Sequence, residues 1–181
     1  MSFKIIPFVK SSDGWTLSDI ELLGIYYKML KHRLVNRVFI QGEADTAEKF
    51  LSVIKNPRNA VNIVINPDGE CLVLSWLNKW GFNNAFVHHC VFPEVWGEKS
   101  VEIGKMILKY WFDMKKDNGE PILDVIMGKT PENNRLAVKF IQRMGFTIVG
   151  TIPNICYDVK SKKKIGAVFS YIQRESINGR E

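Results

Sequence analysis

The spacing of apolar residues changes along the chain, and each change predicts a different secondary structure. An apolar run over residues 4–9, before a Ser-Ser-Asp-Gly turn, predicts a strand. Ser18 and Glu21 have the spacing of a capping box, which marks the start of a helix. The apolar residues of that helix recur at helical spacing, at Ile20, Leu23, Tyr27, Leu30 and Leu34. A second helix is predicted from Thr46 to about Lys55.

The middle of the chain has strand character. Residues 60–65 and 70–77 are apolar runs separated by Asn-Pro-Asp-Gly, a sequence typical of a tight turn. Residues 85–92 are almost wholly apolar apart from His88 and His89, which indicates a strand buried on both faces. This block therefore predicts three consecutive strands.

Helical and strand spacing alternate in the second half. A long amphipathic helix is predicted over residues 100–116, followed by a strand over residues 122–127. Thr130-Pro131 predicts the start of another helix, because proline is favoured at the first helical position. Its buried face would comprise Leu136, Ala137, Phe140, Ile141 and Met144, with Gly145 as its end. Two strands, over residues 147–157 and 167–173, complete the order.

This order predicts an α/β fold in which a mixed sheet carries helices on both faces, within a single domain over residues 1–181. The three cysteines, Cys71, Cys90 and Cys156, form no disulfide or zinc-site spacing, so we expect a reducing, cytoplasmic setting. No apolar run is long enough to span a bilayer, and no signal peptide is recognisable. The net charge is +6, which suits anionic ligands; a nucleic-acid interface is disfavoured because no binding motif accompanies it.

Two stretches resemble the GNAT superfamily of N-acetyltransferases. Asn134 is followed by Ala137 and then by Gly145-Phe146, at the spacing common in that family. Residues 92–99, FPEVWGEK, lie between a predicted strand and a predicted helix, where the family binds the pyrophosphate of coenzyme A. The Trp96-Gly97 pair is similar to the ribosomal-protein N-terminal acetyltransferase branch. The resemblance implies a twisted, mostly antiparallel sheet of about seven strands flanked by four helices.

The resemblance also implies a cofactor, acetyl-CoA, as co-substrate. Asn134 would contact its pantetheine arm. The expected cofactor-binding residues are Val91, Trp96, Gly97, Lys99, Ser100, Val101 and Asn134. The sequence departs from the family pattern at Lys99 and Val101, which replace small residues of the phosphate turn, so these side chains would either obstruct the phosphates or, for Lys99, pair with one.

The reaction implied is direct attack of an amine on the thioester in a ternary complex. A free backbone N–H beside residues 88–91 would polarise the thioester oxygen. His88, His89 and Glu94 are the candidate bases, although a strand histidine is more often structural. The family's usual tyrosine acid is replaced by Ile141. Cys90 fits a core residue better than a nucleophile, and adjacent strand histidines diverge, so no metal is expected.

Two functions stay open on the sequence. The first is an N-acetyltransferase that acts on a small amine or on a protein amino group. The second is a catalytically degenerate GNAT-like fold that serves as a binding or assembly module with a protein partner, as phage-encoded proteins that resemble degenerate members of this superfamily would. The altered phosphate turn favours the second, and Asn134 with Gly145-Phe146 favours the first. The acceptor and the oligomeric state are not readable from the sequence.

Overall fold

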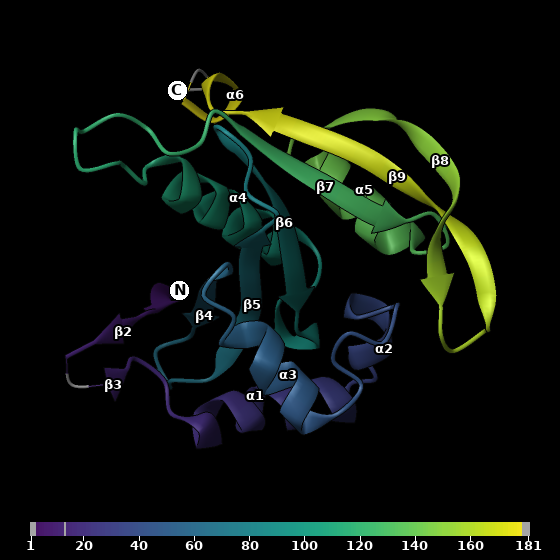
Figure 1. The fold of residues 1–181 in the computed structure, drawn as a ribbon, viewed down its shortest axis with the longest axis horizontal. Coiled ribbons are helices and arrows are strands. Elements are labelled where there is room, and N and C mark those ends of the chain that lie inside the picture. The colour runs from purple at the N-terminus through teal and green to yellow at the C-terminus, as the bar shows by residue number, and fades with distance from the viewer. Residues whose placement is uncertain (1–2, 13, 179–181) are drawn as a thin grey trace.

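A seven-stranded sheet forms the centre of the computed structural model, which describes residues 3–12 and 14–178 (Figure 1). Its strands lie in the order β1-β4-β5-β6-β7-β9-β8. Their bounds are β1 Lys4–Phe8, β4 Ala60–Ile65, β5 Cys71–Asn78, β6 Asn84–Val91, β7 Val125–Pro131, β8 Thr147–Asp158 and β9 Lys163–Gln173. A separate small ribbon joins β2 Lys10–Ser11 to β3 Gly14–Trp15.

The sheet is mixed, as the sequence predicts. Every neighbouring pair of its strands is antiparallel except β6 and β7, which run parallel. That parallel pair lies at the middle of the sheet and joins a half built from hairpins to a half built around a crossover helix. The predicted α/β fold with a mostly antiparallel sheet of about seven strands is therefore confirmed.

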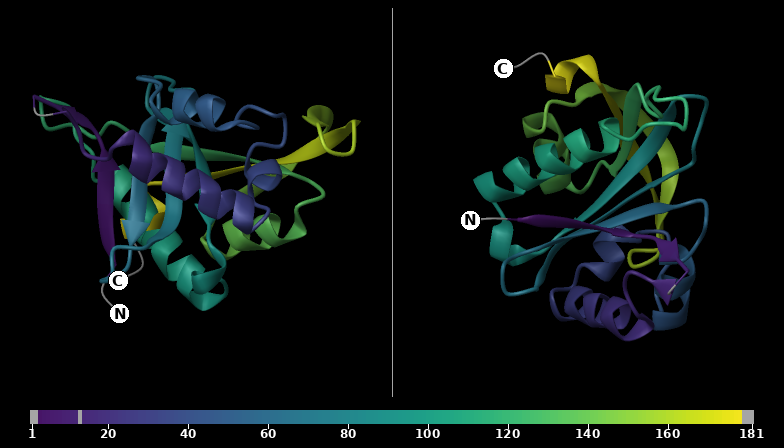
Figure 2. Two further views of the ribbon diagram at one scale, coloured as in Figure 1. Left: turned by 90° about the horizontal axis from the view of Figure 1, so that it is seen from below. Right: turned by 90° about the vertical axis from the view of Figure 1, so that its left-hand side faces the viewer.

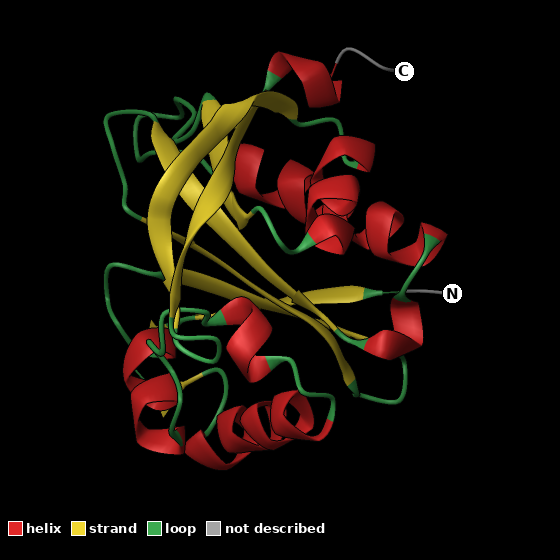
Figure 3. Ribbon diagram, turned by 90° about the vertical axis from the view of Figure 1, so that its right-hand side faces the viewer, coloured by secondary structure: helices red, strands yellow, loops and turns green. Residues whose placement is uncertain are grey.

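Helices cover both faces of the sheet (Figures 2 and 3). Four have eight or more residues: α1 Asp19–Lys31, α3 Ala47–Ile54, α4 Glu98–Phe112 and α5 Arg135–Arg143. Three short helical segments, which the sequence did not predict, are α2 Val35–Val38, the 3-10 turn η1 Pro93–Val95 and α6 Glu175–Asn178. Among the described helices, none combines the length and the apolar character that a bilayer crossing requires.

Two apolar cores lie on opposite sides of the strands. One packs α4 and α5 against the sheet and includes Ile107, Trp111 and Phe146. The other packs the N-terminal helices against it and includes Met29, Phe50 and Trp76. Because side chains alternate along a strand, β6 contributes to both: Val87 lies in the first core and Cys90 in the second.

The first helix forms as predicted, but most of the apolar residues whose spacing indicates it do not pack on the core; of these, Leu34, which follows the helix, is buried. The capping box of Ser18 and Glu21 forms as predicted, but Ile20, Tyr27 and Leu30 are exposed. The residues that face the core are Leu22, Ile25, Tyr26 and Met29. Both sets have helical spacing, so periodicity alone could not decide between them; contact with the sheet does.

The predicted helix start at Thr130-Pro131 is also wrong, because both residues belong to β7. The helix begins at Arg135, where the side-chain oxygen of Asn134 accepts a hydrogen bond from the Ala137 N–H at 3.3 Å. Proline has no backbone N–H to donate, and Pro131 is tolerated because it is the last residue of β7. Leu136, predicted to be buried, is 70% exposed, whereas Ile141 and Met144 are buried as predicted.

Candidate active site

The parallel strands β6 and β7 separate after three pairs of residues. Asn84, Ala85 and Phe86 pair with residues 125–127, and no pairing continues beyond Phe86 and Met127. The other edge of β6 stays paired with β5 as far as Val91. One edge of β6, over residues 87–91, therefore lacks a neighbouring strand, and the gap opens at the carboxyl ends of two parallel strands, where α/β sheets commonly bind ligands.

Backbone groups of β6 point into this gap. The Phe92 N–H donates to the Leu72 carbonyl of β5 at 3.0 Å, so the groups of Val91, one residue earlier, point the opposite way. The Val91 carbonyl accepts a hydrogen bond from the indole N–H of Trp96 at 3.0 Å on that side. The N–H groups of Val91 and, two residues earlier, His89 thus face the gap, as the sequence predicts for residues 88–91.

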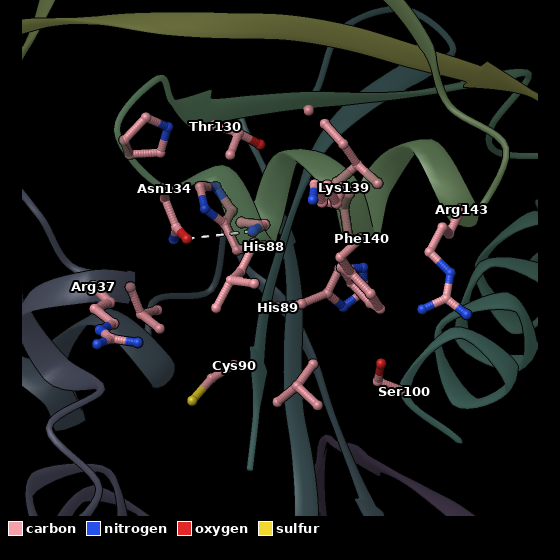
Figure 4. A pocket seen from close by; sticks show the side chains of 18 of the residues that line it. Arg37, His88, His89, Cys90, Ser100, Thr130, Asn134, Lys139, Phe140 and Arg143 are labelled. Atoms are coloured by element: carbon pink, nitrogen blue, oxygen red, sulfur yellow. Dashed lines mark hydrogen bonds between the residues drawn. The ribbon is translucent and has the colours of Figure 1, made fainter. Parts of the chain in front are cut away.

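A cavity of about 450 Å³ occupies the gap (Figure 4). It is walled by α2 on one side, by α5 and the start of α4 on the other, and by β6 and β7 between them. Of the predicted site residues, those that line it are His88, His89, Val91, Trp96, Gly97, Ser100 and Asn134. Residues from five separate segments thus meet at one place.

The start of α4 lies at the mouth of this cavity. Gly97 precedes the helix with φ +93° and ψ −139°, a conformation available only to glycine, and no side chain caps the helix there. The hydroxyl of Ser100 donates to the Gly97 carbonyl at 2.7 Å and so braces the turn. The backbone N–H groups of the first helical turn point out of its start, where the helix dipole favours an anion.

The departures from the family pattern do not block the cavity. Neither Lys99 nor Val101 lines it. The Val101 side chain is buried in the core beneath α4. Obstruction of the phosphate turn, one of the two alternatives raised by the sequence, therefore has no support in the geometry.

The two histidines project to opposite faces of β6. His88 stacks on Trp76 with ring centroids 4.8 Å apart, and its Nε2 lies 3.0 Å from the Asn78 side-chain oxygen. His89 packs edge-on against Phe140 of α5, and neither of its buried ring nitrogens has a hydrogen-bond partner among the described residues.

Both imidazoles are neutral at pH 7. Burial lowers the pKa of His88 to about 4, helped by the charges of Lys79 and Lys129. Burial, and to a smaller extent His88, lowers the pKa of His89 to about 3. Each ring therefore offers one N–H donor and one weakly basic nitrogen.

Neither Glu94 nor Cys90 is placed to act in the reaction, although Cys90 lines the cavity. Glu94 does not line the cavity, and its carboxylate forms an ion pair with Lys28 at 3.0 Å. Burial opposes ionisation of Glu94, but backbone and Lys28 hydrogen bonds outweigh it and lower the pKa of this carboxyl. Burial raises the pKa of the Cys90 thiol far above neutral, so this residue is not a thiolate nucleophile, as its apolar strand indicates.

Four cationic residues of the cavity wall are not among the site residues predicted from the sequence: Arg37, Lys129, Lys139 and Arg143. Arg37 comes from α2, across the cavity from Lys139 and Arg143 of α5 (Figure 4). The available signal was the position of Lys129 at the carboxyl end of β7, parallel to β6. It was obscured because Thr130-Pro131 was interpreted as a helix start.

No group of three or more potential metal ligands occurs in the described part of the chain. The three cysteines are free thiols, with Cys90 and Cys156 buried.

No family model matches the sequence, and no curated protein matches it significantly. Solved structures do match. A spermidine N-acetyltransferase from Vibrio cholerae, in complex with CoA and spermine, aligns with a TM-score of 0.74 over 97% of this chain and 98% of its own, at 14% identity. The chain has the GNAT fold.

Two further similar structures support this assignment. A ribosomal-protein-S5-alanine acetyltransferase from Vibrio fischeri aligns with a TM-score of 0.68 over 96% of this chain and 93% of its own, at 13% identity. A putative acetyltransferase from Acinetobacter baylyi has a TM-score of 0.69 at 12% identity, with 96% and 94% covered. The fold implied by the resemblance in residues 92–99 and 134–146 is therefore confirmed.

Proposed function

We propose that this protein is an acetyl-CoA-dependent N-acetyltransferase that transfers an acetyl group to an amine by direct attack in a ternary complex. The observation that carries the proposal is the cavity between β6 and β7, which combines an unpaired strand edge with an uncapped helix start at its mouth. A thioester with an anionic tail matches this combination, because one end needs N–H donors for a carbonyl and the other needs an anion site.

In this proposal the pyrophosphate of acetyl-CoA binds at the start of α4. Gly97 lets the backbone approach the phosphates, the N–H groups of Lys99, Ser100 and Val101 donate to them, and the Lys99 ammonium adds positive charge. Trp96 lies beside the pantetheine arm, whose amides reach the Val91 edge of β6, and Asn134 contacts the arm from the start of α5.

The chemistry balances without a metal or a covalent enzyme intermediate. The amine nitrogen attacks the thioester carbon, the C–N bond forms, the C–S bond breaks, and coenzyme A leaves as a thiolate. The proton lost by the amine passes to the thiolate or to water. The N–H of His89 or Val91 stabilises the negative charge that develops on the carbonyl oxygen.

The three candidate bases differ in position. His88 faces the α2 side of the cavity, where the amine would enter, and its low pKa makes it a weak base that orients the amine through a hydrogen bond. His89 faces α5 and would donate its N–H to the cofactor. Glu94 would take part only if Lys28 released its carboxylate.

The alternative of a catalytically degenerate binding module rested on the altered phosphate turn, the missing tyrosine and the basic surface. Neither Lys99 nor Val101 lines the cavity, so the first argument loses its support, and the basic residues of the cavity suit an anionic cofactor. Ile141 does replace the tyrosine, but direct attack in a ternary complex does not require that acid at this position. A single proposal therefore stands.

Calorimetric titration of the protein with acetyl-CoA and with S-acetylpantetheine tests it. We expect a micromolar Kd for acetyl-CoA and at least a hundredfold weaker affinity for S-acetylpantetheine, which lacks the phosphates. In Gly97→Val the required backbone conformation is lost, so acetyl-CoA affinity should fall at least tenfold.

Gly119→Val is the matched control. Gly119 also has positive φ, +83°, with open space around its Cβ position, but it lies outside the cavity. Both variants should lose some stability, and only Gly97→Val should lose acetyl-CoA affinity. Absence of binding by the unmodified protein at millimolar acetyl-CoA would refute the proposed function.

A further inference from the structure

The half of the cavity that faces α2 carries positive charge that the cofactor does not explain. Lys139 and Arg143 lie on the α5 side, near the start of α4, where the phosphates of acetyl-CoA would bind. Arg37 lies on the opposite side, on α2 (Figure 4). Lys129 faces the same half, because its neighbours Gly128 and Thr130 alternate with it on β7 and Gly128 faces Phe146 next to α5.

Neither of these two cations has a carboxylate partner among the residues that the structure describes. The Arg37 guanidinium makes no hydrogen bond or ion pair with another described residue. Lys129 is a partly buried residue, and its ammonium donates an exposed hydrogen bond to the Ile155 carbonyl at 3.4 Å. Its charge nevertheless reaches the site, since it helps to lower the pKa of His88. An anion bound in the cavity would supply the counter-ion that these two cations lack among the described residues.

The cavity offers no site for a cationic acceptor. None of the described residues that line it is an aspartate or a glutamate. Carboxylates on neighbouring elements already have partners: Glu94 pairs with Lys28, Glu98 pairs with Arg143 at the cavity wall, and Glu132 accepts from the Gly166 N–H. A polyamine would bring two or more positive charges to Arg37 and Lys129 with nothing to neutralise them.

Resting on the function proposed above, we infer that the acceptor is an amine that also carries an anionic group, a carboxylate or a phosphate, which Arg37 and Lys129 bind. The anion would seat against the α2 side, and the amine would reach the thioester beside His88. The same positive field destabilises the ammonium form of the acceptor and so favours the neutral amine that attacks. Substrate selection thus differs from that of a polyamine acetyltransferase of the same fold.

Matched pairs of acceptors test this inference. Release of coenzyme A thiol from acetyl-CoA is followed with β-alanine against β-alaninamide, for a carboxylate, and with phosphoethanolamine against ethanolamine, for a phosphate; spermidine serves as the polycation. In at least one pair, we expect kcat/KM for the acceptor with the carboxylate or phosphate to be at least tenfold higher than for the partner that lacks this group. It should exceed kcat/KM for spermidine by at least as much. The pair that responds identifies the anion.

Arg37→Glu reverses the charge at the proposed anion site, and Lys31→Glu makes the same change at an exposed position of α1 outside the cavity. The anionic acceptor should lose at least tenfold in kcat/KM, chiefly through KM, in Arg37→Glu, whereas Lys31→Glu should keep the preference. Thermal unfolding confirms that both variants are folded.

The inference is overturned if no acceptor is preferred, if kcat/KM is equal for the two members of each pair, or if kcat/KM is highest for spermidine. Calorimetry with acetyl-CoA separates this outcome from failure of the proposed function. If acetyl-CoA binds and anionic acceptors are not preferred, only the acceptor class is wrong; if acetyl-CoA does not bind, the enzyme proposal itself falls.

Discussion

At the scale of single residues, the site is governed by side chains held in unusual environments. His88 and His89 are neutral because burial penalises the imidazolium. The sequence predicted that both histidines lie on a strand beside the site, and that Gly97 and Asn134 belong to the same site. The basicity of the histidines could not be predicted, because it depends on Trp76, Phe140 and Lys129, which come from other strands and a helix.

The depressed pKa values of the two histidines predict acid sensitivity. Below pH 6.5 both histidines become protonated in the unfolded chain. In the folded protein His88 stays neutral down to about pH 4 and His89 down to about pH 3. Each histidine should therefore lower the free energy of unfolding as the pH falls, by up to about 1.4 kcal/mol per pH unit.

Urea unfolding between pH 7 and pH 4 measures this dependence. His89→Leu removes one titrating group, so the free energy of unfolding should decline less steeply in the variant than in the unmodified protein over the same interval. Identical slopes would show that the buried His89 imidazole is not the source of the acid sensitivity.

At the scale of secondary structure, the pattern of apolar residues predicted most strands and the four longer helices. It failed where two structural interpretations fitted the same residues equally well. On α1 two apolar stripes satisfy helical spacing, and only the sheet selects Leu22 and Met29 for burial. At Thr130-Pro131, proline fits a strand end as well as a helix start. In both cases contacts with other elements of the fold, which the sequence pattern does not contain, select one structure over the other.

The crossing of α4 and α5 depends on a close approach at Gly104. A Cβ at this position would lie 2.2 Å from the Met144 sulfur and 3.1 Å from the Phe140 ring. Met144 is buried, so it has little space into which it can move. Gly104→Ala should therefore lower the free energy of unfolding by about 1 kcal/mol or more, despite the better helix propensity of alanine.

Gly24→Ala is the control for helix propensity. Gly24 is exposed on α1, and a Cβ there would meet nothing within 4 Å. This substitution should raise the free energy of unfolding by about 0.5–1 kcal/mol. If both substitutions stabilise the protein equally in urea unfolding, α4 and α5 do not depend on the small residue at Gly104.

At the scale of the whole molecule, the order of elements along the chain predicted the sheet and its helices, and two short motifs indicated the GNAT fold. The division of the cavity into two charged halves was not predictable, because α2, α5 and β7 meet there only after folding. The basic residues near Arg37 were visible in the sequence as an excess of charge, but their spatial target was not.

The net charge of +6 predicts a salt-dependent affinity for an anionic cofactor. Raising the salt concentration from about 0.05 to 0.5 M should weaken acetyl-CoA binding several-fold, because the screening length falls from more than about 10 Å to less than about 8 Å. The uncharged analogue S-acetylpantetheine should be unaffected. If calorimetry shows the same salt dependence for acetyl-CoA and S-acetylpantetheine, electrostatic attraction does not contribute to cofactor binding.

Hydrogen exchange resolved at single backbone amides, with and without acetyl-CoA, tests most directly whether the cofactor binds between β6 and β7. We expect slower exchange at Val91 and at the first amides of α4, Lys99 to Val101, when acetyl-CoA is added, with the exposed strand β8 unchanged. Protection confined to other elements, or none at saturating acetyl-CoA, would contradict it.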